Sequence, residues 1–135
     1  MREGPCCNMK YRRPYGLELV LDLENCDPSR FTRQNITDYY NNLCQGIDME
    51  LCEVYFWDDL GVPEEDCQTH PDTKGTSSVA FILTSSIVVH TLDVREQVFV
   101  NVFSCKSFNV EAAERVTLEY FRGNVFNKTT IKRGK

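Results

Sequence analysis

SVAFIL at residues 78–83, IVVHT at 87–91 and VFVNVF at 98–103 are three apolar segments that follow one another along the chain. Each is rich in β-branched and aromatic residues, which is typical of strands. The polar breaks between them, Thr84-Ser85-Ser86 and Asp93-Val94-Arg95-Glu96, are short enough for hairpins. We therefore expect an antiparallel meander at the centre of the fold.

Three further strands are predicted outside this meander. Leucine recurs at every second position from Gly16 to Leu23, which is the period of a strand with one face on a core. The segments from Met49 to Trp57 and from Val125 to Ile131 also have the composition of strands.

Two helices are predicted between these strands. The first is expected to start at Asp27-Pro28, because Asp27 can cap free backbone N–H groups and Pro28 suits the first helical position, and to end near Gly46. The second is expected to run from a cap at Asn109 to about Arg122. The order β-α-β-β-β-β-α-β implies an α+β fold, a two-layer sandwich of a mostly antiparallel sheet with two helices on one face.

The chain divides into a short arm and one domain. Residues 1–15 mix Gly, Pro and basic residues without periodicity, so we expect a flexible N-terminal arm, with a single α+β domain over residues 16–135. Pro63 to Gly75 is acidic and turn-forming and is expected to be the longest loop. The pattern allows either a functional loop or a plain connector there.

The charge and the hydropathy of the chain exclude some partners. Its formal net charge is −5, from 15 basic and 20 acidic residues, which disfavours a general nucleic-acid binder. No apolar run reaches the 18 or more residues that span a bilayer, and the first residues lack the apolar core of a signal peptide. We expect a cytoplasmic protein with no membrane or nucleic-acid partner.

The chain has seven cysteines, an odd number with no C-x-x-C pair. Without a secretory signal this count argues against a disulfide framework. Cys67 and His70 could supply two metal ligands, but two ligands do not make a four-coordinate zinc site, and we expect no metal. The cysteines are Cys6, Cys7, Cys26, Cys44, Cys52, Cys67 and Cys105.

Three reactive side chains, Ser85, His90 and Cys105, lie within or just after the apolar meander. Taken singly, Ser85 is a polar residue at a strand break, His90 a core or interface histidine, and Cys105 a small buried residue. Their spacing, with His90 five residues and Cys105 twenty residues after Ser85, resembles that of the prokaryotic S-adenosylmethionine decarboxylases. The resemblance covers most of the chain, through residues 16–27, Gly75-Thr76-Ser77, Ser85-x4-His90-Thr91 and Val102-Phe103-Ser104-Cys105.

The resemblance implies a self-processing enzyme. In this family the serine that matches Ser85 attacks the carbonyl of the preceding residue, here Thr84, and the chain is cut between them. The products would be a β chain of residues 1–84 and an α chain of residues 85–135 that begins with a pyruvoyl group. By the same resemblance His90 is the base that removes the α-proton of residue 85 during processing, and Ser77 assists.

The resemblance also implies the catalytic chemistry. The pyruvoyl carbonyl forms a Schiff base with the substrate amine and accepts electrons when carbon dioxide leaves, so neither pyridoxal phosphate nor a metal is needed. The residue that matches Cys105 returns a proton to the carbanion. Members of the family associate as dimers with active sites near the subunit interface, which implies a homodimer of processed αβ units.

The sequence departs from the family pattern after His90-Thr91. The family commonly continues with Trp-Pro-Glu, which shapes the nucleoside site, whereas this chain has Leu92-Asp93-Val94. We expect S-adenosylmethionine as the substrate and spermidine synthesis as the purpose. Two alternatives stay open: a pyruvoyl decarboxylase of arginine or ornithine, and a non-processing homologue that regulates an active partner.

Overall fold

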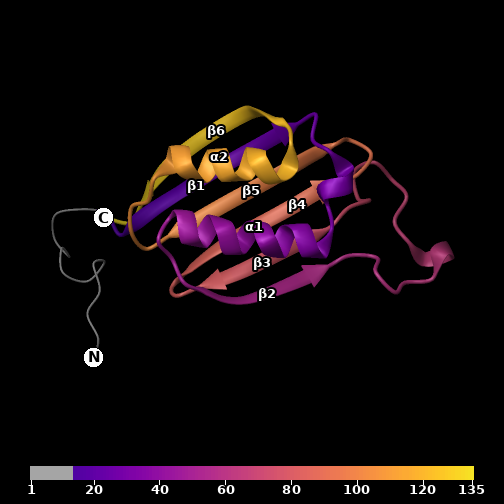
Figure 1. Cartoon of the computed structure of the whole chain (residues 1–135), viewed down its shortest axis with the longest axis horizontal. Coiled ribbons are helices and arrows are strands. Elements are labelled where there is room, and N and C mark those ends of the chain that lie inside the picture. Colours follow the sequence, from indigo (N-terminus) through magenta and orange to yellow (C-terminus); the bar gives the residue numbers. More distant parts are fainter. Residues whose placement is uncertain (1–13) are drawn as a thin grey trace.

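The computed structural model describes residues 14–135, and Figure 1 shows how their strands and helices are arranged. The predicted arm falls almost wholly outside the described residues. The α-helices are α1 (Arg33–Gly46) and α2 (Val110–Phe121), and short 3-10 helices form η1 (Pro28–Arg30) and η2 (Glu64–Asp66). The strands are β1 (Gly16–Glu24), β2 (Leu51–Trp57), β3 (Ser77–Ile82), β4 (Ser85–Leu92), β5 (Gln97–Ser104) and β6 (Asn124–Arg133).

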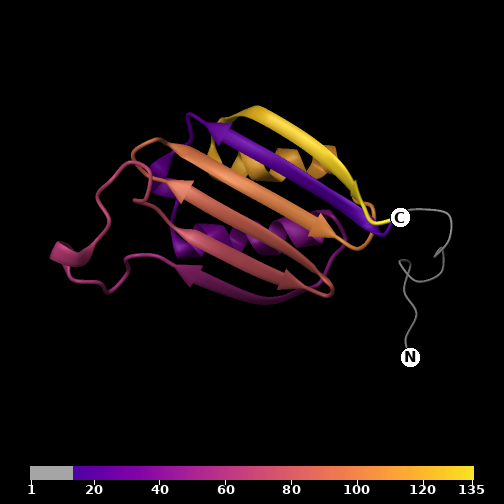
Figure 2. The same cartoon turned by 180° about the vertical axis from the view of Figure 1, so that it is seen from behind.

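The strands form one antiparallel sheet in the order β2-β3-β4-β5-β1-β6. The meander expected from the sequence is present as β3, β4 and β5, and β1 lies between β5 and β6. Both α-helices cover the same face of the sheet (Figure 1), and Figure 2 looks onto the other face, which no described element covers. The predicted α+β sandwich is confirmed.

The core lies between the sheet and the two helices. Side chains of a strand alternate between its faces, and in β4 Ile87 and Val89 are fully buried under the helices whereas Val88 is half-buried and His90 is exposed. On the helical side Tyr39 of α1 bonds to Thr117 of α2 across a buried contact of 2.7 Å between their hydroxyl oxygens. This alternation gives the sheet a helix-covered face and an open face.

The first helix begins later than predicted. Asp27 does cap a helix, but only η1, where its carboxylate accepts a hydrogen bond from the backbone N–H of Ser29. Phe31 then turns into the core, where its ring lies 6.3 Å from that of Phe121, and Thr32 caps α1 instead. The cap signal at Asp27 was correct, and its extension into α1 was wrong because burial of Phe31 interrupts the helix.

The polar break before β4 is shorter than predicted. Ile82 pairs with Ser85, so only Leu83 and Thr84 form the turn, and Ser85 and Ser86 belong to the strand. The ladder continues through these serines because backbone pairing does not depend on an apolar side chain.

The long segment between β2 and β3 is fixed at several points. It contains the predicted loop from Pro63 to Gly75, and an ion pair of 2.6 Å joins its Asp72 to Arg95 in the β4–β5 turn. Gly75 passes close to β4, where a Cβ atom would lie 1.7 Å from the carbonyl oxygen of Thr91. Only glycine fits that approach, so the entry into β3 is held against β4.

Candidate functional site

Ser85 lies at the end of the sheet where β3 turns into β4. Its side chain is 8% exposed and belongs to the helix-covered face. The backbone N–H of Cys105, just beyond the end of β5, donates a hydrogen bond of 3.0 Å to Ser85 Oγ. This bond holds the Ser85 hydroxyl oxygen and places the backbone of Cys105 next to residue 85.

Thr84, the residue before Ser85, occupies the second position of the two-residue turn. Its φ is +56°, in the left-handed region, and its side chain is exposed. The Thr84 hydroxyl donates a hydrogen bond of 2.7 Å to the carbonyl oxygen of Leu83. The Thr84–Ser85 peptide bond therefore joins an exposed turn residue to a buried, anchored one.

His90 and Ser77 lie together on the open face. They are direct partners in the β3–β4 ladder, and Ser77 Oγ lies 2.8 Å from His90 Nδ1. His90 is exposed and Ser77 half-buried. The hydrogen bond orients the imidazole and leaves its Nε2 edge free of any contact with Ser77, which is the arrangement of a positioned base.

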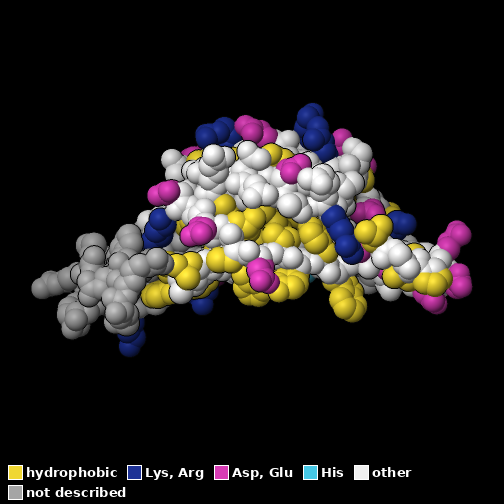
Figure 3. All heavy atoms as spheres, turned by 60° about the horizontal axis from the view of Figure 1, so that its bottom comes forward, with side chains coloured by type: hydrophobic (Ala, Val, Ile, Leu, Met, Phe, Trp, Pro, Cys, Tyr) yellow, Lys and Arg dark blue, Asp and Glu magenta, His cyan; other side chains and the backbone are white. Residues whose placement is uncertain are grey.

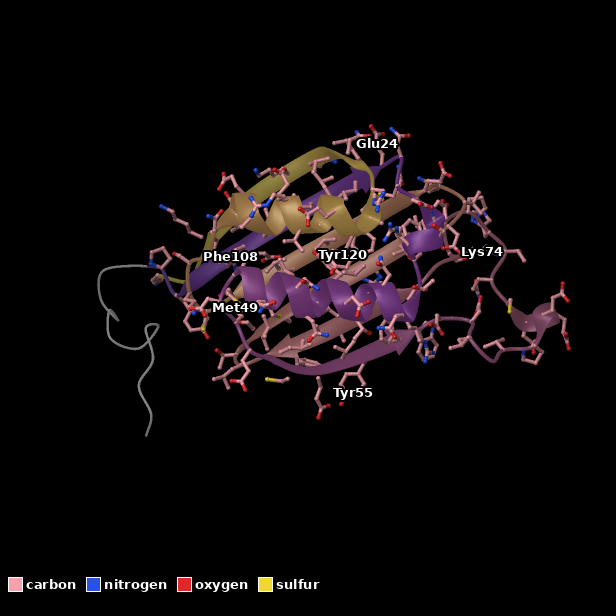
Figure 4. All side chains as sticks on the ribbon, viewed as in Figure 1. Glu24, Met49, Tyr55, Lys74, Phe108 and Tyr120 are labelled. Carbon is pink, nitrogen blue, oxygen red and sulfur yellow. The ribbon has the colours of Figure 1, made fainter. Side chains whose placement is uncertain are left out.

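The two halves of the predicted site are far apart within one chain. His90 follows Ser85 by five positions in a continuous strand, which places them about 16 Å apart along it. Because five is odd, their side chains leave opposite faces of the sheet. Met49 and Phe108 lie at the end that holds the β3–β4 turn, and Lys74 lies at the opposite end, where the long loop enters β3 (Figure 4). The structure therefore brings together Ser85 with Cys105, and Ser77 with His90, but not these two pairs.

Two hollows flank the Ser77–His90 pair on the open face. One of about 310 Å³ contains Tyr55, Trp57, Val79 and Val88 in its lining, and the other, of about 360 Å³, contains Leu92 and Phe99. The Trp57 side chain is 83% exposed. Sequence reasoning missed these aromatic residues, although alternation along β2 and β5 could have placed Tyr55, Trp57 and Phe99 on one face with His90.

Exposed hydrophobic side chains extend beyond these hollows. Tyr55 and Phe81 are about half exposed, and their rings meet edge to face at 6.1 Å. Figure 3 shows hydrophobic side chains gathered along the edge of the molecule that Figure 1 draws at the bottom, where β2 lies. Large exposed apolar areas of this kind mark interaction or ligand sites.

The described cysteines differ strongly in their surroundings. Burial raises the pKa of the Cys26 thiol to about 12, with a further contribution from Glu96, and burial raises that of Cys44 to about 11. Neither is a nucleophile or an acid of use near neutral pH. Cys52 is exposed, and Cys67 donates to the carbonyl oxygens of Val62 and Pro63. Cys6 and Cys7 lie outside the described residues, and Cys26, Cys44, Cys52 and Cys67 form no disulfide.

The described part of the chain contains no group of three His, Cys, Asp or Glu side chains arranged to hold a metal ion. Within the same residues no helix is long and apolar enough to cross a membrane.

Residues 17–134 match the family model described as S-adenosylmethionine decarboxylase, and the match spans most of the chain. No curated protein matches it.

Proposed function

The chain belongs to the S-adenosylmethionine decarboxylase family, and from this premise we propose that it is a self-cleaving, pyruvoyl-dependent S-adenosylmethionine decarboxylase. Cleavage between Thr84 and Ser85 would give chains 1–84 and 85–135, and the product would be the aminopropyl donor for spermidine synthesis. The observation that carries the proposal is the buried Ser85 hydroxyl held by the Cys105 amide at 3.0 Å, directly after an exposed turn. Its cytoplasmic location stays a prediction.

The residues around position 85 fit a pyruvoyl group derived from Ser85. When formed, this group supplies an electrophilic carbonyl that binds the substrate amine and accepts electrons as carbon dioxide leaves. The Cys105 amide holds the Ser85 hydroxyl in place before cleavage. The thiol of the same residue is the proposed acid that returns a proton to the substrate carbon. On the β3 side, Ile82 pairs with Ser85 and keeps residue 85 in the sheet.

His90 can act on residue 85 only if it comes from a second chain. Within one chain about 16 Å of strand separates the His90 side chain from residue 85. We infer that the enzyme is a homodimer in which the open faces meet, so that Ser77 and His90 of each copy serve Ser85 of the other. A two-fold axis that lies between the two open faces, perpendicular to β4 near its middle, would place His90 of one copy over the backbone of residue 85 of the other, which carries the α-proton. The exposed aromatic side chains of Tyr55, Trp57 and Phe81 support burial of this face.

The hollows beside His90 favour a substrate with an aromatic ring. Leu92 replaces the usual tryptophan, but Phe99 lies beside it in one hollow and Trp57 lines the other. Aromatic faces of this kind can stack on adenine, whereas ornithine has no planar group to stack. The apolar character of Leu92 keeps decarboxylation of arginine or ornithine as the second candidate.

Two measurements test the proposal. Intact mass under denaturing conditions should show two fragments of about 84 and 51 residues for the parent chain, and one uncut chain for Ser85→Ala. The cleaved protein should release carbon dioxide from S-adenosylmethionine. Release from only arginine or ornithine would establish the second candidate, and a parent chain that stays intact would favour the regulatory homologue. Normal cleavage of Ser85→Ala would refute the assigned site.

A further inference from the structure

We propose that Thr84 is a strained residue whose left-handed backbone drives the cleavage of the Thr84–Ser85 bond. This inference rests on the proposed function, because it assigns a role within self-cleavage. The structural observation is the φ of +56° at Thr84. A β-branched residue is a conformational outlier there, because its Cβ substituents crowd the backbone.

The turn is disfavoured in a second way. Ile82 pairs directly with Ser85, which leaves only Leu83 and Thr84 between the strands. The favoured two-residue hairpin turns need a positive φ at their first position. Here Leu83 is not among the residues with positive φ, and the left-handed conformation falls on Thr84 alone. Both the turn geometry and the residue at its second position are therefore unfavourable.

Thr84 differs from the other left-handed residues of the described chain. Asn25, Asp48, Glu96 and Arg122 also have positive φ, but none of these is β-branched. Asn and Asp tolerate this region because their short polar side chains bond locally. Among residues 14–135, the one β-branched residue in this conformation directly precedes the proposed scission point.

The neighbours of Thr84 hold the strained turn in place. Ile82 on one side is 4% exposed and packs in the core, and Ser85 on the other is 8% exposed and anchored by the Cys105 amide. Thr84 itself is exposed, so burial of its side chain does not compensate the strain. The turn therefore cannot relax without breaking either the core contact or the anchor.

The first step of cleavage, an acyl shift from the nitrogen to the Oγ atom of residue 85, relieves the strain at Thr84 while Ile82 and Ser85 stay in place. Ser85 Oγ forms a bond to the carbonyl carbon of Thr84, the C–N peptide bond breaks, and the hydroxyl proton ends on the nitrogen of residue 85. The path from that carbon to Cα of residue 85 then runs through Oγ and Cβ and is one bond longer than through the nitrogen. Thr84 is no longer confined to a two-residue turn, so it can leave the left-handed region.

Substitutions at Thr84 separate strain from side-chain chemistry. Thr84→Gly removes the strain, since glycine adopts positive φ freely, and we expect its cleavage to be slower by about fivefold or more. Thr84→Val keeps the β-branch but lacks the hydroxyl, and we expect cleavage within about twofold of the parent rate. The rate is measured after cell-free translation, as the appearance of the two fragments on a denaturing gel. Glu96→Gly, at another left-handed turn with φ of +55°, is the matched control and should cleave at the parent rate.

A stability readout does not depend on cleavage. In the uncleavable Ser85→Ala chain, Thr84→Gly should raise the thermal midpoint by about 3 °C relative to Glu96→Gly, which carries the same flexible residue without the same relief. Equal cleavage rates for Thr84→Gly and Thr84→Val, or no gain in thermal midpoint, would overturn the inference. An intact parent chain would instead overturn the proposed function, whereas a parent that cleaves as fast as Thr84→Gly would overturn this inference alone.

Discussion

The two faces of β4 have different roles although they belong to one strand. The helix-covered face carries Ile87 and Val89, which have no exposed surface, and it stabilises the fold. The open face carries Val88 and His90, which lie beside hollows and exposed aromatic side chains. Ser85 belongs to the first face and His90 to the second. One chain therefore carries both parts of the proposed site but does not bring Ser85 and His90 together.

The largest effect on cleavage is expected when Ser85 and His90 are supplied by different chains. Ser85→Ala and His90→Ala should each stay uncut when expressed alone, the first because it lacks the nucleophile and the second because it lacks the base. When they are expressed together, the His90→Ala chain should be cut, because its Ser85 meets an intact His90 in a mixed dimer. Intact mass of the purified mixture measures this.

Two results would contradict that expectation. Cleavage of His90→Ala on its own would show that its imidazole is dispensable. An uncut mixture that nevertheless contains mixed dimers would show that His90 does not act across the interface.

The next largest effect is expected on decarboxylation, when Cys105, the proposed acid, is substituted. Cys105→Ala should still be cleaved, because its backbone N–H remains to hold Ser85 Oγ. Its decarboxylation should fall by about 10²–10⁴-fold, which is the usual contribution of a positioned acid. Carbon dioxide release measures the rate, with the exposed Cys52→Ala as a control that should be unchanged. Full activity of Cys105→Ala would remove the thiol from the mechanism.

Substitutions of the neighbouring residues Val88 and Val89 compare what the two faces of β4 contribute to stability and to dimerisation. In the Ser85→Ala chain, Val89→Ala should lower the free energy of unfolding by roughly 2 kcal/mol, because it leaves a cavity under the helices. Val88→Ala should lower it by roughly 0.5 kcal/mol and should chiefly weaken dimerisation. Denaturant unfolding and sedimentation measure the two quantities. Equal losses of stability, with unchanged association, would argue against an interface on the open face.

The smallest effect is expected at Ser77. Ser77→Ala removes the hydrogen bond to His90 Nδ1 and should slow cleavage by roughly threefold to tenfold, since such a bond contributes about 1 kcal/mol. Ser78→Ala is the matched control on the opposite face of β3, where the hydroxyl bonds to the carbonyl oxygen of Tyr55. If Ser78→Ala slowed cleavage as much as Ser77→Ala, a positioning role for Ser77 would be excluded.

Much of the fold could be predicted because alternation is visible in the sequence. The leucines of β1 and the valines of β5 lie on the core face as their period of two implies. The start of α1 could not be placed at Arg33, because the cap signals at Asp27-Pro28 are equally good locally and only the burial of Phe31 decides between them.

Less of the candidate site than of the fold could be predicted from the sequence. The resemblance selected Ser85, His90 and Cys105, and the odd spacing of Ser85 and His90 within one strand already places their side chains on opposite faces. That Cys105 lies beside Ser85 depends on the register between β4 and β5, in which Ser86 faces Phe103. Register follows from turns and packing across the whole sheet, so it cannot be deduced from either segment alone.

The strand order has a consequence for the protein after it is cut. Residues 1–84 contribute β1, β2 and β3, and residues 85–135 contribute β4, β5 and β6. Because β1 is inserted between β5 and β6, the two fragments are interleaved and do not sit side by side. They can separate only if β1 is pulled out of its ladders with β5 and β6 and β3 is detached from β4. A protein with this interleaved sheet can lose the Thr84–Ser85 peptide bond and still remain one folded unit.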